Sequence, residues 1–144
     1  MKDLVRLNCK TIILRNTFKK IERLHSKLLI SKLFAKGKSF FLYPFRVTFI
    51  LDERKDGSPV QILISASKRN FKSAVKRNHI KRLIREAYRK NKHIVWDYLS
   101  DKPNNQLIIS VVYTAKTIAS YSEIERKLIL VLHSLIEKNE EHNR

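Results

Sequence analysis

The most strongly patterned part of the chain is residues 65–92, which read SASKRNFKSAVKRNHIKRLIREAYRKNK. From Lys68 onward this segment holds eleven of the 31 lysine and arginine residues but a single acidic residue, Glu86. Beyond Ser73, apolar residues recur at the spacing of a helix, namely Ile80, Leu83, Ile84 and Ala87. The spacing predicts an amphipathic helix that buries a stripe about 100° wide, and Ser73 fits its N-cap because a hydroxyl can accept from a first-turn amide.

The polar side of this predicted helix carries an unbalanced set of charges. Six donor side chains share an arc of about 140° beside the apolar stripe, and they are Arg77, Asn78, Lys81, Arg82, Arg85 and Arg89. Like charges four residues apart destabilise an isolated helix by about 0.2–0.5 kcal/mol per pair, and a face that served only solubility would mix signs. Because arginine presents planar donors that suit phosphate oxygens, we expect this face to bind a polyanion. A plain solvated surface is the alternative.

The composition agrees with that expectation and limits the domain organisation. A chain of 144 residues suits one domain with a real core, expected at residues 17–137 between a basic extension (1–16) and a polar tail (138–144). The formal charge of +18 indicates nucleic acid or an anionic membrane surface as the partner. No apolar run approaches the roughly 20 residues of a membrane span, so a cytoplasmic location without membrane contact is expected. Cys9 is the only cysteine, which excludes an intrachain disulfide and a cysteine-rich zinc site.

Three segments have the pattern of β-strands, residues 45–52, 60–67 and 107–113. The first two alternate between apolar and other residues, and the polar run between them predicts a turn. In the second strand the odd-numbered positions include Ser65 and Ser67, so we expect one core face and one largely polar face. The third is almost continuously apolar, which is typical of a strand covered on both faces.

Two further helices are expected around these strands. Residues 26–36 carry apolar pairs four residues apart, as on the buried side of a short helix. A last helix is predicted from Ser120 or Ser122, each followed three residues later by a glutamate as in a capping box, to about Glu137. With residues 93–105 interpreted as a loop, the order α-β-β-α-β-α predicts an α+β fold in which a small mixed sheet is packed with helices.

The residues around the basic helix resemble the signature of the protein subunit of bacterial ribonuclease P. That signature is a Ser-Lys that ends a strand, a short loop, and a helix with an Arg-Asn-Arg triple followed by Lys-Arg and another Arg. Ser67-Lys68 and residues 74–89 match it almost continuously, and the wider resemblance covers residues 17–136. The chain departs from the signature at His79, which replaces the second arginine of the triple, and its loop is one residue longer than in many relatives.

The resemblance implies a fold and a function. The fold is a small ribosomal-protein-like domain whose strand, basic helix and strand cross over with left-handed connectivity. In that family the RNA subunit and its Mg²⁺ ions remove the 5′ leader from precursor tRNA, and the protein assists by binding. The expected partners are therefore the ribonuclease P RNA subunit and precursor tRNA with its leader. The chain itself would be a non-catalytic accessory subunit, monomeric outside the holoenzyme, and its Mg²⁺ would be held mainly by the RNA.

The resemblance also implies two binding surfaces, whose residues carry over by position. Expected at the catalytic RNA are Arg77, Asn78, Lys81, Arg82 and Arg85, with Lys76, His79 and Arg89 beside them. Expected at the single-stranded leader are Ser65, Ser67, Lys68, Phe34 and Phe49. Core packing is the alternative for both aromatic residues, and it is favoured for Phe49 because the pairing register between its strand and Ser65 is not known from the sequence.

The sequence lacks groups that would let the chain cleave RNA alone. A protein nuclease needs carboxylates gathered around Mg²⁺ or a histidine acid/base pair. Asp52, Glu53 and Asp56 cluster only in the polar turn, and His79 and His93 have no acid positioned nearby. A ribosomal-type structural RNA-binding protein is the main alternative function. A DNA-binding regulator is disfavoured because the basic helix lies between strands, outside any helix-turn-helix unit.

Overall fold

The computed structural model describes residues 18–54 and 58–142. Its elements are η1 (Lys20–Glu22), α2 (Lys27–Lys36), β1 (Lys38–Leu42), β2 (Phe45–Glu53), β3 (Val60–Ala66), α3 (Ala74–Asn91), α4 (His93–Leu99), β4 (Asn105–Tyr113) and α5 (Tyr121–His142). The strands form one sheet in the order β1-β2-β4-β3. Because β4 pairs antiparallel with β2 and parallel with β3, the sheet is mixed. The basic extension predicted for residues 1–16 lies outside the described residues.

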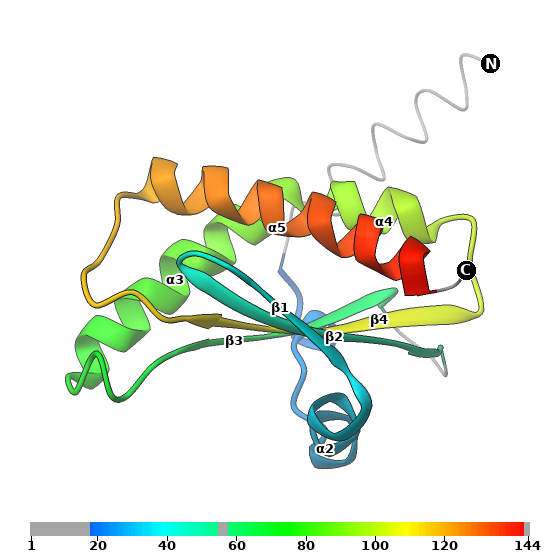
Figure 1. The fold of residues 1–144 in the computed structure, drawn as a ribbon, viewed down its shortest axis with the longest axis horizontal. Helices are drawn as coiled ribbons and strands as arrows, with labels where there is room; N and C mark the ends of the chain where they lie inside the picture. Colours follow the sequence, from blue (N-terminus) through cyan, green and yellow to red (C-terminus); the bar gives the residue numbers. More distant parts are fainter. Residues whose placement is uncertain (1–17, 55–57, 143–144) are drawn as a thin grey trace.

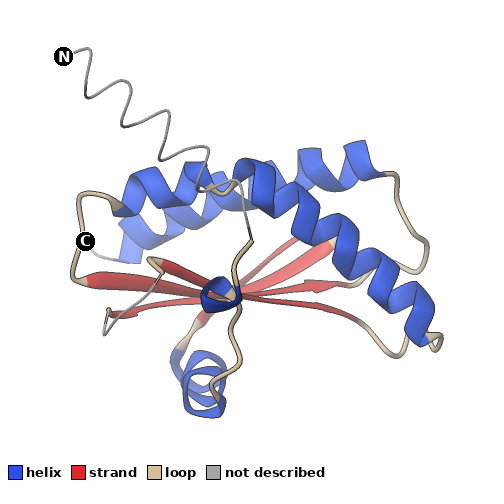
Figure 2. Ribbon diagram, turned by 180° about the vertical axis from the view of Figure 1, so that it is seen from behind, coloured by secondary structure: helices blue, strands red, loops and turns tan. Residues whose placement is uncertain are grey.

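The sheet separates two unequal layers of helix. Helices α3, α4 and α5 lie on one face, and α2 lies on the other (Figure 1), where Figure 2 shows it from behind. The main hydrophobic core lies between the sheet and helices α3, α4 and α5. A smaller core of Leu24, Leu33 and Ile108 lies under α2. Arg46 and Phe41 are exposed on the strands, so this second helix layer does not cover the whole sheet.

The unit from β3 through α3 and α4 to β4 joins two parallel neighbours by a left-handed crossover. In Figure 1 both strands run from right to left, α3 returns above them, and the sheet order runs from β1 at the front to β3 at the back. The path therefore climbs from the rear strand over the top to the front strand, which is the left-handed sense. Crossovers of this kind are right-handed in about 98% of cases, so the expected unusual connectivity is confirmed.

The predicted elements are present and in the predicted order. The basic helix begins directly after Ser73, whose Oγ accepts a hydrogen bond from Lys76 N at 3.4 Å. α2 begins in the same way after Ser26, whose Oγ accepts from Leu29 N at 3.4 Å. A side-chain cap of this type replaces one of the hydrogen bonds that first-turn amides cannot make within the helix. The α+β class is confirmed.

Three parts of the chain differ from the expectations. β1 was not predicted, because its sequence KSFFL does not alternate; it forms the sheet edge by pairing with β2. Residues 93–99 form α4, where a loop was expected, because the apolar side chains of this segment enter the main core. α5 continues past Glu137 into the predicted polar tail, where Asn139 is 2% exposed. Its Nδ2 donates to Tyr98 Oη on α4 at 3.1 Å, and this contact orders the polar end of the helix.

Candidate nucleic-acid interface

α3 turns its cationic side away from the main core. The residues that it buries are Ile80, Ile84, Ala87 and Tyr88, each 0% exposed. Relative to the predicted stripe, the buried side is shifted toward Tyr88, and Leu83 is only partly buried. Asn78 and Arg82 are exposed, and half-buried beside them is a row spaced four residues apart, Arg77, Lys81 and Arg85.

The described part of the protein does not neutralise these cations. Within residues 18–54 and 58–142, the ion pairs to carboxylates do not include Arg77, Lys81, Arg82 or Arg85. Partial burial lowers the pKa of Arg85, and the nearby charges of Arg23 and Arg82 lower it further. Crowded like charges are unfavourable unless an anion compensates them. The row therefore has the electrostatic character of a site for phosphate groups.

Arg77 makes structural contacts that the sequence did not indicate. Its Nη1 donates to the backbone oxygens of Phe71 at 2.7 Å and of Lys72 at 2.9 Å. These carbonyls belong to the loop between β3 and α3, so the guanidinium braces that loop. The remaining N–H groups of Arg77 can still face a ligand, because arginine has five donors.

The position of Arg89 corrects one expectation. It was expected in the set of donors that face a polyanion, but its Nε and Nη2 donate to Glu86 at 3.0 and 2.6 Å. These bonds lower the pKa of Glu86 and raise that of Arg89. A helical wheel places Glu86 outside the cationic arc because it records only the angle of the Cα atom, whereas a flexible arginine reaches a carboxylate three residues earlier. Arg89 is thus already engaged within the protein.

Polar residues of β3 point away from the main core, as predicted. Ser65 pairs with Val112 of β4, and Val112 pairs with Arg46 of β2. Directly paired residues share one face of a sheet, so these three side chains form a row on the face that carries α2. Arg46 is exposed and is a cation that was not expected at this surface. Strand alternation alone could have identified it only if the register between the strands had been known.

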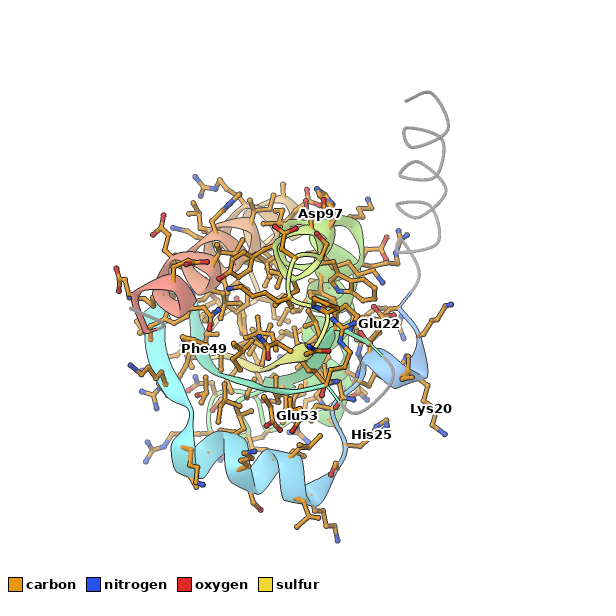
Figure 3. All side chains as sticks on the ribbon, turned by 90° about the vertical axis from the view of Figure 1, so that its right-hand side faces the viewer. Lys20, Glu22, His25, Phe49, Glu53 and Asp97 are labelled. Atoms are coloured by element: carbon orange, nitrogen blue, oxygen red, sulfur yellow. The ribbon has the colours of Figure 1, made fainter. Side chains whose placement is uncertain are left out.

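The two candidate aromatic residues differ in their surroundings. Phe34 on α2 is 57% exposed, so the core-packing alternative does not hold for it. Phe49 is 3% exposed and packs edge-on against Phe40, with ring centroids 6.1 Å apart. It pairs with Ile109, on the opposite sheet face from Ser65, and Figure 3 shows it among the packed interior side chains. The expectation that Phe49 contacts the leader is therefore wrong, because strand parity directs it into the core.

A polar hollow lies at the carboxyl ends of the parallel strands β3 and β4. It has a volume of about 660 Å³, and its lining residues are Ser67, Arg69, Asn70, Thr114 and Lys116. Asn70 Nδ2 donates to Thr114 O at 2.7 Å and ties the two strand ends together. Lys68 is exposed next to this hollow. Ser67 and Lys68, expected at the leader, thus lie beside two further cations, Arg69 and Lys116.

The remaining predicted contacts, Lys76 and His79, are both exposed on α3. Asp52, from the acidic cluster of the predicted turn, accepts a hydrogen bond from Lys32 Nζ at 2.8 Å. In the part of the chain that the structure describes, no three His, Cys, Asp or Glu side chains gather as a metal site would require. None of the described helices is long and apolar enough to span a membrane.

Comparison of the sequence with known proteins identifies relatives of this chain. A sequence model of the family described as Ribonuclease P matches residues 18–135. A protein of Porphyromonas gingivalis named "Ribonuclease P protein component" is 43% identical over 83 residues, which cover 58% of this chain and 61% of that protein, less than two thirds of its length. A protein of Chlorobium phaeobacteroides with the same name is 32% identical over 129 residues, covering 83% of this chain and 88% of that protein.

Solved structures show the same fold. The chain resembles the RNase P protein of Staphylococcus aureus with a TM-score of 0.60 and 24% identity, covering 79% of this chain and 94% of that one. It resembles the RNase P protein of Thermotoga maritima with a TM-score of 0.57 and 24% identity, covering 77% of this chain and 94% of that one. At this level of sequence identity, the two structures show a shared fold and nothing more.

Proposed function

The chain belongs to the ribonuclease P protein family, and on that premise we propose that it is the protein component of a ribonucleoprotein that removes the 5′ leader from precursor tRNA. The RNA subunit is the catalyst. The protein binds that RNA through α3 and binds the leader on the sheet face that carries α2. It acts as an accessory subunit in the cytoplasm, monomeric until it joins the RNA.

One observation most directly supports binding of the catalytic RNA and of the leader on two separate surfaces. The α3 row of Arg77, Lys81 and Arg85 forms no ion pair within the described residues, and its member Arg85 lines a hollow with residues 62–64 of β3. The polar side chain of Ser65, on the same strand, lies on the opposite face of the sheet. Two surfaces suited to RNA therefore meet at one edge of the sheet. A protein that binds only one RNA needs only one of them, whereas a subunit that connects a catalytic RNA with its substrate needs both.

On the catalytic-RNA side, the donors act by binding phosphate oxygens. Arg82 and Asn78 are exposed, and Lys81 and Arg85 are half-buried beside them. Guanidinium groups suit the paired oxygens of phosphates, and ammonium groups act as point charges. Within residues 18–54 and 58–142, no three metal-ligating side chains gather. Mg²⁺ is held mainly by the RNA, and the protein's cations favour the folded RNA by neutralising phosphates nearby.

On the leader side, contact with the substrate discriminates precursor from product, since only the precursor carries the extra nucleotides. Phe34, 57% exposed, offers a ring on which a leader base can stack. Ser65 and Arg46 offer a hydroxyl and a guanidinium on the same face of the sheet. The hollow at Ser67 and Arg69 continues this surface toward the start of α3.

Reconstitution tests the proposal. The chain is added to a bacterial ribonuclease P RNA at low Mg²⁺, and cleavage of precursor tRNA at the mature 5′ end is measured. We expect strong stimulation, and a larger gain in affinity for precursor with a leader than for mature tRNA. Binding of the RNA without any stimulation would instead support a ribosomal-type structural role. Because salt-dependent phosphate binding is common to both roles, the cleavage assay is the discriminating measurement.

A further inference from the structure

The segment between η1 and α2 is fixed along the open edge of the sheet. β3 is the outer strand on the side of the sheet opposite β1, and Arg23 forms a parallel bridge with its residue Ile62. Leu24 N donates to Ile62 O at 3.0 Å, and the Leu24 side chain enters the smaller core at 3% exposure. The backbone at Arg23 is therefore held in place at the edge of β3.

Arg23 and Arg85 line the same hollow, which has a volume of about 180 Å³. Its other walls come from Phe18, Leu24, His25 and residues 62–64 of β3. The Arg23 guanidinium carbon lies 5.3 Å from the centroid of the Phe18 ring, a cation–π arrangement that orients the group. Two guanidinium groups from separate parts of the chain thus meet at one partly apolar site.

The charges at this hollow are left uncompensated by the described part of the protein. The ion pairs found there involve neither Arg23 nor Arg85. The pKa of Arg85 is lowered first by burial and then by the charge of Arg23, so the two cations repel each other. Holding them together costs free energy unless an anion binds between them, and a phosphate is the anion that two arginines suit best.

We propose that Arg23 and Arg85 together bind one RNA phosphodiester, with His25 at the rim of the same hollow. The site lies at the edge of β3 and connects the cationic side of α3 with the sheet face that carries α2. It deepens the proposed function, since the phosphate belongs either to the ribonuclease P RNA or to the leader of the precursor. Arg23 is thereby a binding residue that lies outside the signature helix.

Lys20 provides a matched control on the same short segment. It is exposed on η1 and extends away from the body of the molecule, whereas Glu22 points inward (Figure 3). Lys20→Ala and Arg23→Ala each remove one positive charge close together in the sequence. The Arg23 side chain is exposed, and the substitution leaves its backbone bridge in place, so the variant is expected to keep its fold, as circular dichroism and the thermal midpoint can verify.

The first measurement is equilibrium binding of the protein to ribonuclease P RNA without precursor, over a range of salt concentrations. The second is binding of precursor tRNA, with and without a leader, by the assembled holoenzyme. In at least one of the two measurements, Arg23→Ala should weaken binding about tenfold, which is the effect of losing one charge-assisted hydrogen-bonded contact. The salt slope of that measurement should fall by about 0.9, because one phosphate contact is lost. A deficit in the first measurement assigns the phosphate to the ribonuclease P RNA, and one only with leader-bearing precursor assigns it to the leader.

A double substitution tests whether the two arginines share one phosphate. If they do, Arg23→Ala combined with Arg85→Ala should weaken binding by less than the product of the single effects. Arg23→Lys, which keeps the charge but loses the planar fork, should fall between wild type and Arg23→Ala. The site is refuted if Arg23→Ala matches Lys20→Ala in every assay, or if the two arginine effects multiply independently.

A third assay separates failure of this site from failure of the proposed function. A short single-stranded RNA of mixed sequence is titrated at low salt and followed by fluorescence anisotropy. Suppose that the wild-type chain does not stimulate cleavage by ribonuclease P RNA, but Arg23→Ala weakens oligonucleotide binding more than Lys20→Ala does. This result would support the phosphate site and refute the ribonuclease P role. If the wild-type chain stimulates cleavage, but Arg23→Ala and Lys20→Ala bind all RNAs equally well, the result would support the ribonuclease P role and refute the phosphate site.

Discussion

The ammonium nitrogen of Lys92 lies 2.5 Å from Oε1 of Glu22, and both side chains are 2% exposed. The other oxygen of Glu22 accepts from Lys19 N at 2.5 Å, and Lys92 Nζ lies 4.6 Å from the centroid of the Trp96 ring. This pair joins η1 to the junction between α3 and α4, across 70 positions of sequence. It fixes the start of the domain against the basic helix, one residue before Arg23, and so contributes to the position of the arginine that meets Arg85.

We predict that Glu22→Ala destabilises the protein by about 3–5 kcal/mol, because it leaves a buried ammonium without its counter-ion. The free energy of unfolding from urea denaturation measures this loss. The double variant Glu22→Leu/Lys92→Met removes both charges and keeps apolar volume, so it should recover most of the stability. If the double variant loses as much free energy of unfolding as Glu22→Ala, or more, the pair stabilises the protein through contacts other than its charges.

The basic helix could be predicted in detail because a helix is a local structure. The spacing of Ile80, Ile84 and Ala87 sets the buried side through the fixed rotation per residue, and the positions of Arg82 and Arg85 follow from the same geometry. Ser73 as the N-cap is equally local, because its partner is the amide of Lys76. The fold class followed from these local patterns.

Features that depend on pairing between distant segments could not be predicted. Phe49 alternates correctly within its strand, but only the pairing with Ile109 shows that it shares the core face. Arg23 lies in a segment with no periodicity, and its position depends on the bridge to Ile62 and on the buried pair of Glu22. The Arg89 side chain depends on a rotamer, which a helical wheel does not describe.

Arg85→Ala should weaken binding of ribonuclease P RNA and lower the salt slope by about one unit, because one phosphate contact is lost. Arg126→Ala is the matched control, since Arg126 is an exposed arginine of α5 and the charge change is the same. Filter-binding titrations at several salt concentrations measure both quantities. Equal effects of the two substitutions would show that only the total charge of the protein matters.

Glu86→Gln should tighten RNA binding. The substitution removes the one acidic group of α3, which lies just outside the cationic arc, and loosens Arg89, which donates two hydrogen bonds to Glu86. Affinity at low salt should rise by a few-fold, and the salt slope should increase by up to about one unit. Glu123→Gln, on exposed residue Glu123 of α5, controls for the change in net charge. An unchanged slope in Glu86→Gln would place this end of α3 outside the RNA contact.

His79→Arg should tighten RNA binding slightly, because it restores a cation at the position where the family signature has one. His79 is exposed on α3, so the longer side chain requires no repacking. The effect should be modest, since His79 lies about 60° beyond the edge of the cationic arc at 100° per residue. The same titrations measure it, and an unchanged affinity together with an unchanged salt slope would show that position 79 does not reach the RNA.

Phe34→Ala should weaken holoenzyme binding of precursor tRNA that carries a leader, and leave binding of mature tRNA unchanged. The expected loss is about 1–3 kcal/mol, the usual contribution of one base stacked on an aromatic ring. Stability should change little, because the ring is 57% exposed. Leu28→Ala is the matched control, as Leu28 lies on the same helix and is 84% exposed. Equal losses for precursor and mature tRNA would mean that Phe34 supports the fold of α2 or the assembly of the holoenzyme, and leader stacking would be refuted.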